Sequence, residues 1–352
     1  MGYRGCMGLK HLGSALVAGV LALAMPAQAQ THQQPGTQSG EYQALFDKML
    51  GTEPRVPQGF RTIQESPLGL AIARLAEGSD GRIGVYAIDL SSGQEVGVLA
   101  DQRFPMASTS KVAIAATYLA GVDQGRWSLT REIRLPRPGG AYMSAKQHLD
   151  LMISKSCNDC TDALLAAVGG PTAVNQWMRQ AGITDFQLNR DIATLIREDG
   201  RTDPASSIDL RDSATPRAMG QLLAGIYQGR WLSSDSRRVL MNAMNETTTG
   251  KQRMRSALPS SAGLAHKTGT LSRTASDIGI FHTPDGRAIA VAIYVTGQSP
   301  SMAYENGNRS AKLAARRQRD SRIATIAGAL YQGFGSRADD GRVWANADYG
   351  GQ

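Results

Sequence analysis

The spacing of apolar residues divides the chain into two strand-forming regions with a helical region between them. Residues 83–90 alternate as a strand does, and residues 95–99 form a second strand after a Ser-Ser-Gly turn. After residue 259 the two-residue period returns at 265–270, 277–282 and 288–295. Because strands occur near both ends of the chain, one sheet must be assembled from both ends.

Helical spacing fills the interval between these strand regions. We predict helices at 67–77, 112–119, 148–153, 161–168, 173–180, 216–228, 234–244 and 323–334, with no convincing hairpin between the two strand regions. Residues 183–214 form a long charged stretch that contains Gly and Pro, of a length typical of functional or mobile loops. The predicted fold is α/β: an antiparallel sheet flanked by helices, built from both chain ends, with an inserted all-α domain.

The predicted domain boundaries follow this layout. The sheet domain takes residues 59–103 and 251–335, the all-α domain takes residues 104–250 with a long loop at 188–214, residues 30–58 form a flexible lead-in with a short helix, and residues 336–352 form a loose tail. The 41% hydrophobic content of the 352 residues suits a globular protein with a core. A cleft between the two domains is the expected place for a site.

The first 29 residues have the features of a signal peptide. Arg4 and Lys10 precede an apolar run over 12–25, and Ala27-Gln28-Ala29 is a small-x-small cleavage pattern. The run is short for a membrane span. We therefore expect cleavage near Ala29 and a soluble, periplasmic or secreted protein, with an uncleaved anchor as the alternative.

The formal net charge of +8 identifies no partner by itself. Its basic residues cluster only at Arg316, Arg317, Arg319 and Arg322, where they alternate with alanines on a predicted helix. A solvated helix face explains this cluster better than a nucleic-acid or membrane surface. We expect no nucleic-acid partner, no membrane span after cleavage, and a monomer.

Two short motifs supply groups for nucleophilic catalysis. The first pairs a candidate nucleophile with a base. Ser108 and Lys111 precede an apolar helical run at 112–119, so the hydroxyl and the amine lie about one turn apart on one face. A neutral lysine can take the serine proton. By itself the pair also fits a helix cap and a solvated lysine. A second motif, Ser156-x-Asn158, offers a hydroxyl that protonates a leaving nitrogen and an amide that holds a substrate amide.

The third motif lies on a predicted strand of the last sheet region. Lys267 adds positive charge, Thr268 and Thr270 can bind a carboxylate, and Gly269 leaves the strand edge unobstructed for a substrate. The adjacent His266 is explained as a strand neighbour of Lys267. Because the few histidines lack ligand spacing, we expect no metal and no cofactor.

These three motifs, in this order and on these elements, resemble the penicillin-recognising serine enzymes, and specifically the class A β-lactamases. The resemblance covers about residues 60–335 and includes the segments 104–111 and 245–255. It implies a β-lactamase/transpeptidase-like fold, a hydrolase that opens the β-lactam amide through an acyl-enzyme on Ser108, and a carboxylate-binding role for Arg253, as in some members.

One departure from the family concerns the release of the acyl group. The resemblance places a glutamate that activates the deacylating water at the position of Ile192, and an aliphatic side chain cannot act as a base. Either deacylation is slow or another carboxylate serves. The candidate bases are Asp191, Glu198 and Asp199 in the loop and Asp162, where the family usually has asparagine.

The same loop has a predicted neck, and a second departure lies in the Ser156-x-Asn158 motif. The resemblance implies that Arg190 pairs with Asp212 to close the loop. Cys157 replaces the usual aspartate of the family and lies three residues before Cys160. Buried helix cysteines are the first interpretation of this pair, and a disulfide is the second.

The sequence leaves three functional readings. The first is a serine β-lactamase, and the second is a D,D-peptidase-like penicillin-binding enzyme that acts on peptidoglycan stem peptides and deacylates slowly. The third is a non-catalytic β-lactam or peptidoglycan receptor, for which the sequence offers no output module. The overall resemblance favours the β-lactamase.

Overall fold

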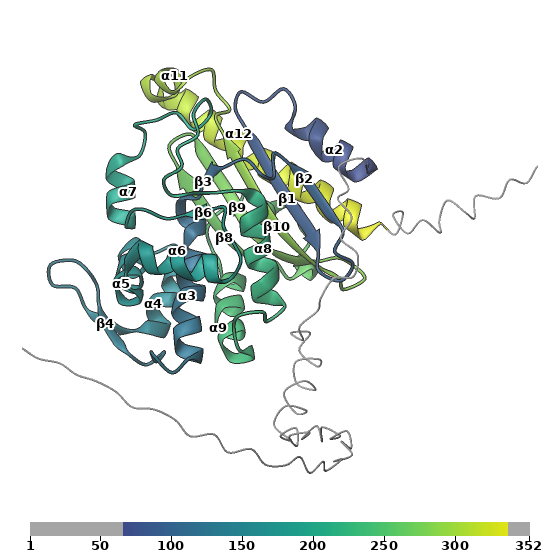
Figure 1. Cartoon of the computed structure of the whole chain (residues 1–352). Coiled ribbons are helices and arrows are strands. Elements are labelled where there is room, and N and C mark those ends of the chain that lie inside the picture. Colours follow the sequence, from purple (N-terminus) through teal and green to yellow (C-terminus); the bar gives the residue numbers. More distant parts are fainter. Residues whose placement is uncertain (1–65, 337–352) are drawn as a thin grey trace, which may run out of the picture. The chain divides into compact units, whose positions relative to one another are not determined.

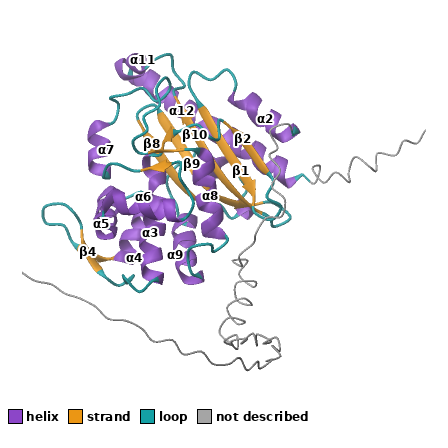
Figure 2. Ribbon diagram, in the orientation of Figure 1, coloured by secondary structure: helices purple, strands orange, loops and turns teal. Residues whose placement is uncertain are grey.

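The structure is a computed structural model that describes residues 66–336. Its central element is a five-stranded antiparallel sheet (Figures 1 and 2). Its strand order is β2-β1-β10-β9-β8, formed by β1 (Ile83–Asp89), β2 (Glu95–Val98), β8 (Ala265–Leu271), β9 (Thr274–His282) and β10 (Ala288–Thr296). The predicted signal segment, the lead-in and nearly all of the predicted tail lie outside the described residues.

The two ends of the described chain meet in the middle of this sheet. β1 pairs with β10 in a register that runs from Ile83 opposite Val295 to Asp89 opposite Ile289. Every residue of both strands is buried because helices cover both faces of the sheet. The predicted antiparallel sheet built from both chain ends is confirmed.

Alternate residues of β1 enter two different hydrophobic cores. Tyr86 and Ile88 pack in the core shared with α8 (Pro216–Tyr227), whereas Val85 and Ala87 pack in the core shared with α12 (Arg309–Gly335). α2 (Pro67–Ala76) packs against α12 and β2 on the second face. This alternation follows from the pleat of a strand, which directs successive side chains to opposite faces.

The helices of the inserted region surround one apolar helix. α3 (Lys111–Asp123) follows the 3₁₀ turn η1 (Ala107–Ser110) and is buried over most of its length, as expected of a helix that is apolar all round. Around it lie α4 (Ala145–Ser154), α5 (Asn158–Val168), α6 (Gly170–Gln180) and α9 (Ser234–Asn245). After this region the short α10 (Met254–Ala257) packs against α12, and the 3₁₀ turn η2 (Ser260–Ala262) leads into β8.

The inserted region is not purely helical, which corrects the expectation of an all-α block without hairpins. It contains the hairpin β4 (Glu132–Arg134) with β5 (Tyr142–Ser144). It also contains a small sheet of β3 (Phe104–Pro105), β7 (Ser213–Ala214) and β6 (Phe186–Gln187). Strands of two or three residues are too short to show a period, so the pattern could not predict them.

Three helices, α7, α11 and α12, depart from the expected loops and boundaries. α7 (Ile192–Glu198) forms inside the long loop, capped by the Asp191 carboxylate, which accepts the backbone N–H of Thr194 at 2.7 Å. α12 begins at Arg309, well before the predicted start, and α11 (Met302–Gly307) precedes it. No helix among the described residues is long and apolar enough to cross a membrane.

The arginine cluster of α12 is only partly a solvated face. Arg316 and Arg317 are exposed, whereas Arg319 is buried and pairs with the buried Glu305, with an Nη2–Oε1 distance of 2.8 Å. Arg322 donates to the carbonyl of Leu75 at 2.8 Å. The solvated-face interpretation is therefore wrong for Arg319 and Arg322, whose charged groups anchor the helix to neighbouring segments.

Candidate active site

The nucleophile candidate, Ser108, lies in the 3₁₀ turn that joins β3 to α3. Its neighbour Ala107 has a φ of 49°, in the left-handed region, and the flanking Met106 and Thr109 side chains are buried. Thr109 Oγ1 donates to the Met106 carbonyl at 2.7 Å and fixes the turn. The turn therefore holds the half-buried Ser108 in one place at the start of α3.

Lys111 is fully buried at the first turn of α3. Its Nζ donates to the Ser156 carbonyl at 2.8 Å and to Asn158 Oδ1 at 2.8 Å, and it lies 3.2 Å from Ser156 Oγ. Burial lowers the pKa of Lys111 to about 7, against the opposing charge of Asp162. A large fraction of Lys111 is therefore a neutral amine near neutral pH, as a general base requires.

No hydrogen bond joins Lys111 Nζ to Ser108 in the described structure, so the base contacts the second motif rather than the nucleophile. Catalytic contacts commonly tighten only when substrate is bound. The Lys111 contact with Ser156 Oγ connects the base to the hydroxyl that the sequence assigned to the leaving nitrogen. Lys111, Ser156 and Asn158 thus form one polar cluster around the buried amine.

The second motif lies on a tight connection between α4 and α5. Ser156 has a φ of 58°, and the Cys157 backbone N–H donates to the Leu151 carbonyl at 3.1 Å. Cys157 and Cys160 form a disulfide with a Cα–Cα distance of 5.3 Å. The first interpretation, buried helix thiols, is therefore wrong; Cys157 caps α5 and Cys160 follows one turn later, which brings the two sulfurs together.

The third motif occupies the edge strand β8. Thr268 Oγ1 lies 2.6 Å from Thr249 Oγ1. At Gly269 a Cβ would lie 2.7 Å from the Met106 carbonyl oxygen and 2.4 Å from Ser276 Oγ. Glycine is therefore needed here for the close approach of β8 to the nucleophile turn, a reason that differs from the predicted opening for a substrate.

Lys267 is also fully buried, and its Nζ donates to the Thr268 carbonyl at 2.9 Å. Burial, together with the charges of Lys111 and Arg253, lowers the pKa of Lys267 well below its usual range, while Asp277 opposes this. An anionic group nearby would oppose this lowering of the pKa. The adjacent His266 pairs with Asp277 in the core, with Nδ1 2.8 Å from Oδ1.

Arg253 is buried beside β8 and already has partners for its three nitrogens. Its Nε donates to Asp320 Oδ1 at 2.6 Å, Nη1 donates to the Gly269 carbonyl at 2.7 Å, and Nη2 donates to Thr270 Oγ1 at 2.7 Å. Arg253 therefore orients Thr270, the predicted carboxylate ligand. Asp320 lies on α12 and was missed by sequence reasoning, because nothing in its local sequence marks it.

Residues from all three motifs line one cleft of ≈ 400 Å³. Its lining contains the predicted residues Ser108, Ser156, Asn158, Arg253, Thr268 and Thr270, together with Thr249, Gly250, Lys251, Gln252, Arg316 and Asp320. The segment 245–255, which carries part of the family resemblance, supplies most of the additional residues. Arg316 has no partner among the described residues, so it adds an unpaired cation to the cleft.

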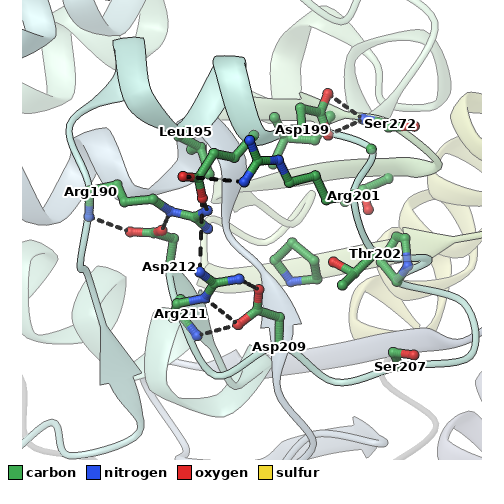
Figure 3. Close-up of a pocket in the computed structure, with 16 residues that line it drawn as sticks. Arg190, Leu195, Asp199, Arg201, Thr202, Ser207, Asp209, Arg211, Asp212 and Ser272 are labelled. Carbon is green, nitrogen blue, oxygen red and sulfur yellow. Dashed lines mark hydrogen bonds and ion pairs between the residues drawn. The ribbon is translucent and has the colours of Figure 1, made fainter.

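The 188–214 loop is closed by an ion pair at its neck (Figure 3). Arg190 Nε lies 2.5 Å from Asp212 Oδ2, and the other Asp212 oxygen accepts the backbone N–H groups of Asn189 and Arg190 at 2.7 and 3.0 Å. Arg190 also pairs with Glu198 at 2.6 Å. A small cavity of ≈ 60 Å³ lies under this loop and contains none of the three motifs.

The loop is also attached to the sheet. The Asp199 carboxylate accepts the backbone N–H of Ser272 at 2.9 Å, and burial raises the pKa of Asp199 (Figure 3). Asp203 pairs with Arg273 at 2.9 Å, and the guanidinium of Arg82 donates to the Pro204 carbonyl at 2.9 Å. These contacts anchor the loop beside the end of β8.

None of the four candidate deacylation bases lines the cleft in the part of the chain that the structure describes. Asp191 caps α7, Glu198 pairs with Arg190, and Asp199 binds the turn after β8. Asp162 accepts the backbone N–H groups of Ile192 and Ala193 at 2.7 and 3.0 Å. Its pKa is raised by burial, and its charge reaches Lys111.

Comparison with known proteins identifies the family. The model of the β-lactamase enzyme family matches residues 67–334. The chain belongs to this family. It is 28% identical to β-lactamase VEB-1 of Pseudomonas aeruginosa over 67% of this chain and 84% of that one. It is likewise 28% identical to β-lactamase SME-1 of Serratia marcescens, over 65% of this chain and 80% of that one.

The structural comparison agrees. The ancestral class A β-lactamase GNCA superimposes with a TM-score of 0.67 at 30% identity, over 76% of this chain and 100% of that one. The predicted class A family, the fold class and the general activity of a serine β-lactam hydrolase are thereby confirmed. The roles of individual residues are proposed below.

Proposed function

We propose that this β-lactamase opens the β-lactam amide bond through an acyl-enzyme on Ser108. The observation that supports this most is the single cleft that brings Ser108, Ser156 and Thr270 together from three separated motifs. A helix cap would need neither of the other two motifs. The buried amine of Lys111 supplies a base next to this cleft.

In acylation, neutral Lys111 takes the proton of Ser108, whose oxygen attacks the amide carbonyl. The backbone N–H groups of Ser108 and Thr270 hold the oxyanion as it forms. The departing nitrogen takes a proton from Ser156, which Lys111 resupplies across their 3.2 Å contact. The amide bond breaks, and the carbonyl carbon remains bound to Ser108 Oγ.

The substrate carboxylate binds at the β8 side of the cleft. Thr268 and Thr270 donate their hydroxyl protons to it, and Lys267 adds charge from below. Arg253 acts mainly by orienting Thr270, because Asp320 and two carbonyls occupy its other nitrogens. Asn158 holds the amide of the substrate side chain.

In the proposed reaction, deacylation is the slow step. Water must attack the acyl carbon, and each of the four candidate carboxylates is engaged elsewhere. Ile192 cannot activate water. Lys111, once neutral again, is the base that remains next to the cleft, so the acyl-enzyme is expected to persist longer than one whose water is activated by a dedicated carboxylate.

A chromogenic cephalosporin with parallel intact-mass measurement tests this assignment. Sustained turnover with a transient adduct supports the β-lactamase. A single-equivalent adduct that persists indicates the D,D-peptidase-like alternative instead, and hydrolysis of a peptidoglycan stem peptide would establish it. If Ser108→Ala retains turnover or the adduct, the assignment of the nucleophile is wrong.

We also infer export to the periplasm or the outside of the cell, a monomeric state and a contribution to antibiotic resistance. The basic, apolar and small-x-small pattern of residues 1–29 supports export. N-terminal sequencing of the exported protein checks cleavage near Ala29. Light scattering checks the monomer, and the minimal inhibitory concentration of penicillins in an expressing host checks resistance.

A further inference from the structure

The Cys157–Cys160 disulfide closes a covalent ring that contains the backbone of residues 157–160. Asn158, whose Oδ1 accepts from Lys111 Nζ at 2.8 Å, is one of these four residues. Ser156, whose carbonyl and hydroxyl contact the same amine, directly precedes it. Among residues 66–336, every hydrogen-bond partner of the Lys111 amine therefore belongs to the ring or to the residue directly before it.

The disulfide lies at the N-terminus of α5, where a capping side chain usually restrains the first turn of a helix. Cys157 is the N-cap of α5, and its Sγ accepts the Cys160 backbone N–H at 3.1 Å. Sulfur is a weak acceptor, and oxygen-bearing side chains are the usual N-caps. The covalent bond between positions 157 and 160 thus replaces the restraint that a capping carboxylate would give to the first turn.

The connection before the ring needs such a restraint. Ser156 adopts a left-handed φ of 58°, a strained conformation for a non-glycine residue that persists only when its surroundings hold it. The Lys111 amine is buried and would lose its hydrogen-bond partners if this segment relaxed. Opening the ring is therefore expected to shift Ser156 and Asn158 away from the Lys111 amine.

We propose that the Cys157–Cys160 disulfide positions Ser156 and Asn158 on Lys111, so that Ser108 is acylated rapidly only in the oxidised protein. Cys157 and Cys160 are positioning residues in this scheme, which rests on the proposed acyl-enzyme. A dithiol in the surrounding solution supplies two electrons and two protons, the S–S bond breaks into two thiols, and the dithiol becomes its own disulfide. Cys157 is half-buried, which gives a reductant access to the bond. The chain would then remain poorly active in a reducing compartment.

The experiment measures the acylation rate constant of the purified full chain with a cephalosporin, by quenched flow and intact mass. A Cys6→Ser background leaves only the pair as thiols, and mass shifts after alkylation count them. We expect reduction to lower the acylation rate by roughly tenfold, equivalent to about 1.4 kcal/mol. Cys157→Ala with Cys160→Ala should show the slow rate without reductant.

A rescue variant separates positioning from general loss of structure. Cys157→Asp with Cys160→Ala restores an oxygen cap without a disulfide and should acylate close to the oxidised rate, insensitive to dithiol. Equal acylation rates for the oxidised protein and for the Ala/Ala variant would overturn the proposal, as would failure of the aspartate to restore the rate. If the oxidised protein itself forms no Ser108 adduct, the proposed function has failed instead.

Discussion

The Asp162 carboxylate accepts the backbone N–H of Ile192 at 2.7 Å, which joins α5 to the first turn of α7. Its other oxygen accepts the N–H of Ala193 at 3.0 Å, so both oxygens are used to hold the loop. Its charge also raises the pKa of Lys111 against the effect of burial. One carboxylate thus connects the loop that lacks the family glutamate to the buried amine of Lys111.

Replacing this carboxylate with an amide should change the pH profile of acylation. In Asp162→Asn the pKa of Lys111 should fall below its value of about 7, because an opposing charge is removed. The acid limb of the acylation rate should therefore move to lower pH. An unchanged limb would contradict the coupling of the two side chains.

In the unaltered protein, the acylation rate should rise as pH increases through about 7, because Lys111 loses its proton there. The rate constant for Ser108 adduct formation, measured from pH 5 to 9 by intact mass, checks this. Lys111→Arg remains charged throughout this pH range and cannot serve as a base, so it should abolish the limb and slow acylation by roughly 10²–10⁴-fold. A normal limb in this variant would exclude Lys111 as the base.

Introducing a carboxylate at position 192 should accelerate release of the acyl group. Ile192 is only 3% exposed and lies beside Asp162, so burial and the neighbouring charge would raise the pKa of a glutamate there toward that of a useful base. Ile192→Glu should shorten the adduct lifetime by at least roughly tenfold. Ile192→Gln, similar in size but not basic, is the matched control, and an equal effect in both variants would point to altered packing.

The buried amine should also make stability depend on pH. Between about pH 7 and 10.5 the unfolded chain holds the Lys111 proton and the folded chain does not, so the free energy of unfolding rises with pH. This one group contributes ~1.4 kcal/mol per pH unit. Lys111→Met lacks this contribution, so its stability relative to the unaltered protein should fall as pH rises from 7.5 to 9. The free energy of unfolding of both proteins is measured by urea denaturation at each pH. An equal change with pH in both proteins would contradict the burial of an uncharged amine.

Two arginines of the cleft should behave differently. Arg253→Gln should lower the thermal midpoint because it leaves the Asp320 carboxylate without its buried partner, at a cost of about 3 kcal/mol or more. Arg316→Gln should leave the midpoint unchanged, because Arg316 is exposed and has no partner among the described residues. It should instead raise KM for substrates that carry an additional anionic group. Arg317→Gln, exposed on the same helix but outside the cleft lining, is the control for general charge.

The chemistry of the site could be predicted from sequence because reactive side chains are defined by residue type and short spacing. Ser108 with Lys111, and Ser156 with Asn158, are separated by two or three positions, so the short chain between them keeps the members of each pair near one another. The sheet built from both chain ends followed in the same way from the periods of its strands. The absence of a base at Ile192 was implied by the resemblance to the class A family, in which that position carries a glutamate.

Burial and pairing depended on segments distant in sequence, so only the tertiary structure decided them. Asp320 on α12 pairs with Arg253, and the buried Glu305 pairs with Arg319. Nothing in the local sequence of either arginine indicates that it is buried with a carboxylate partner. The spacing of Cys157 and Cys160 is compatible with free thiols or with a disulfide. The structure decides for the disulfide, because the N-cap position of Cys157 on α5 brings the two sulfurs together. The sequence by itself determined which groups are present, whereas packing around Lys111 decided its low pKa, because desolvation depends on every element that encloses the amine.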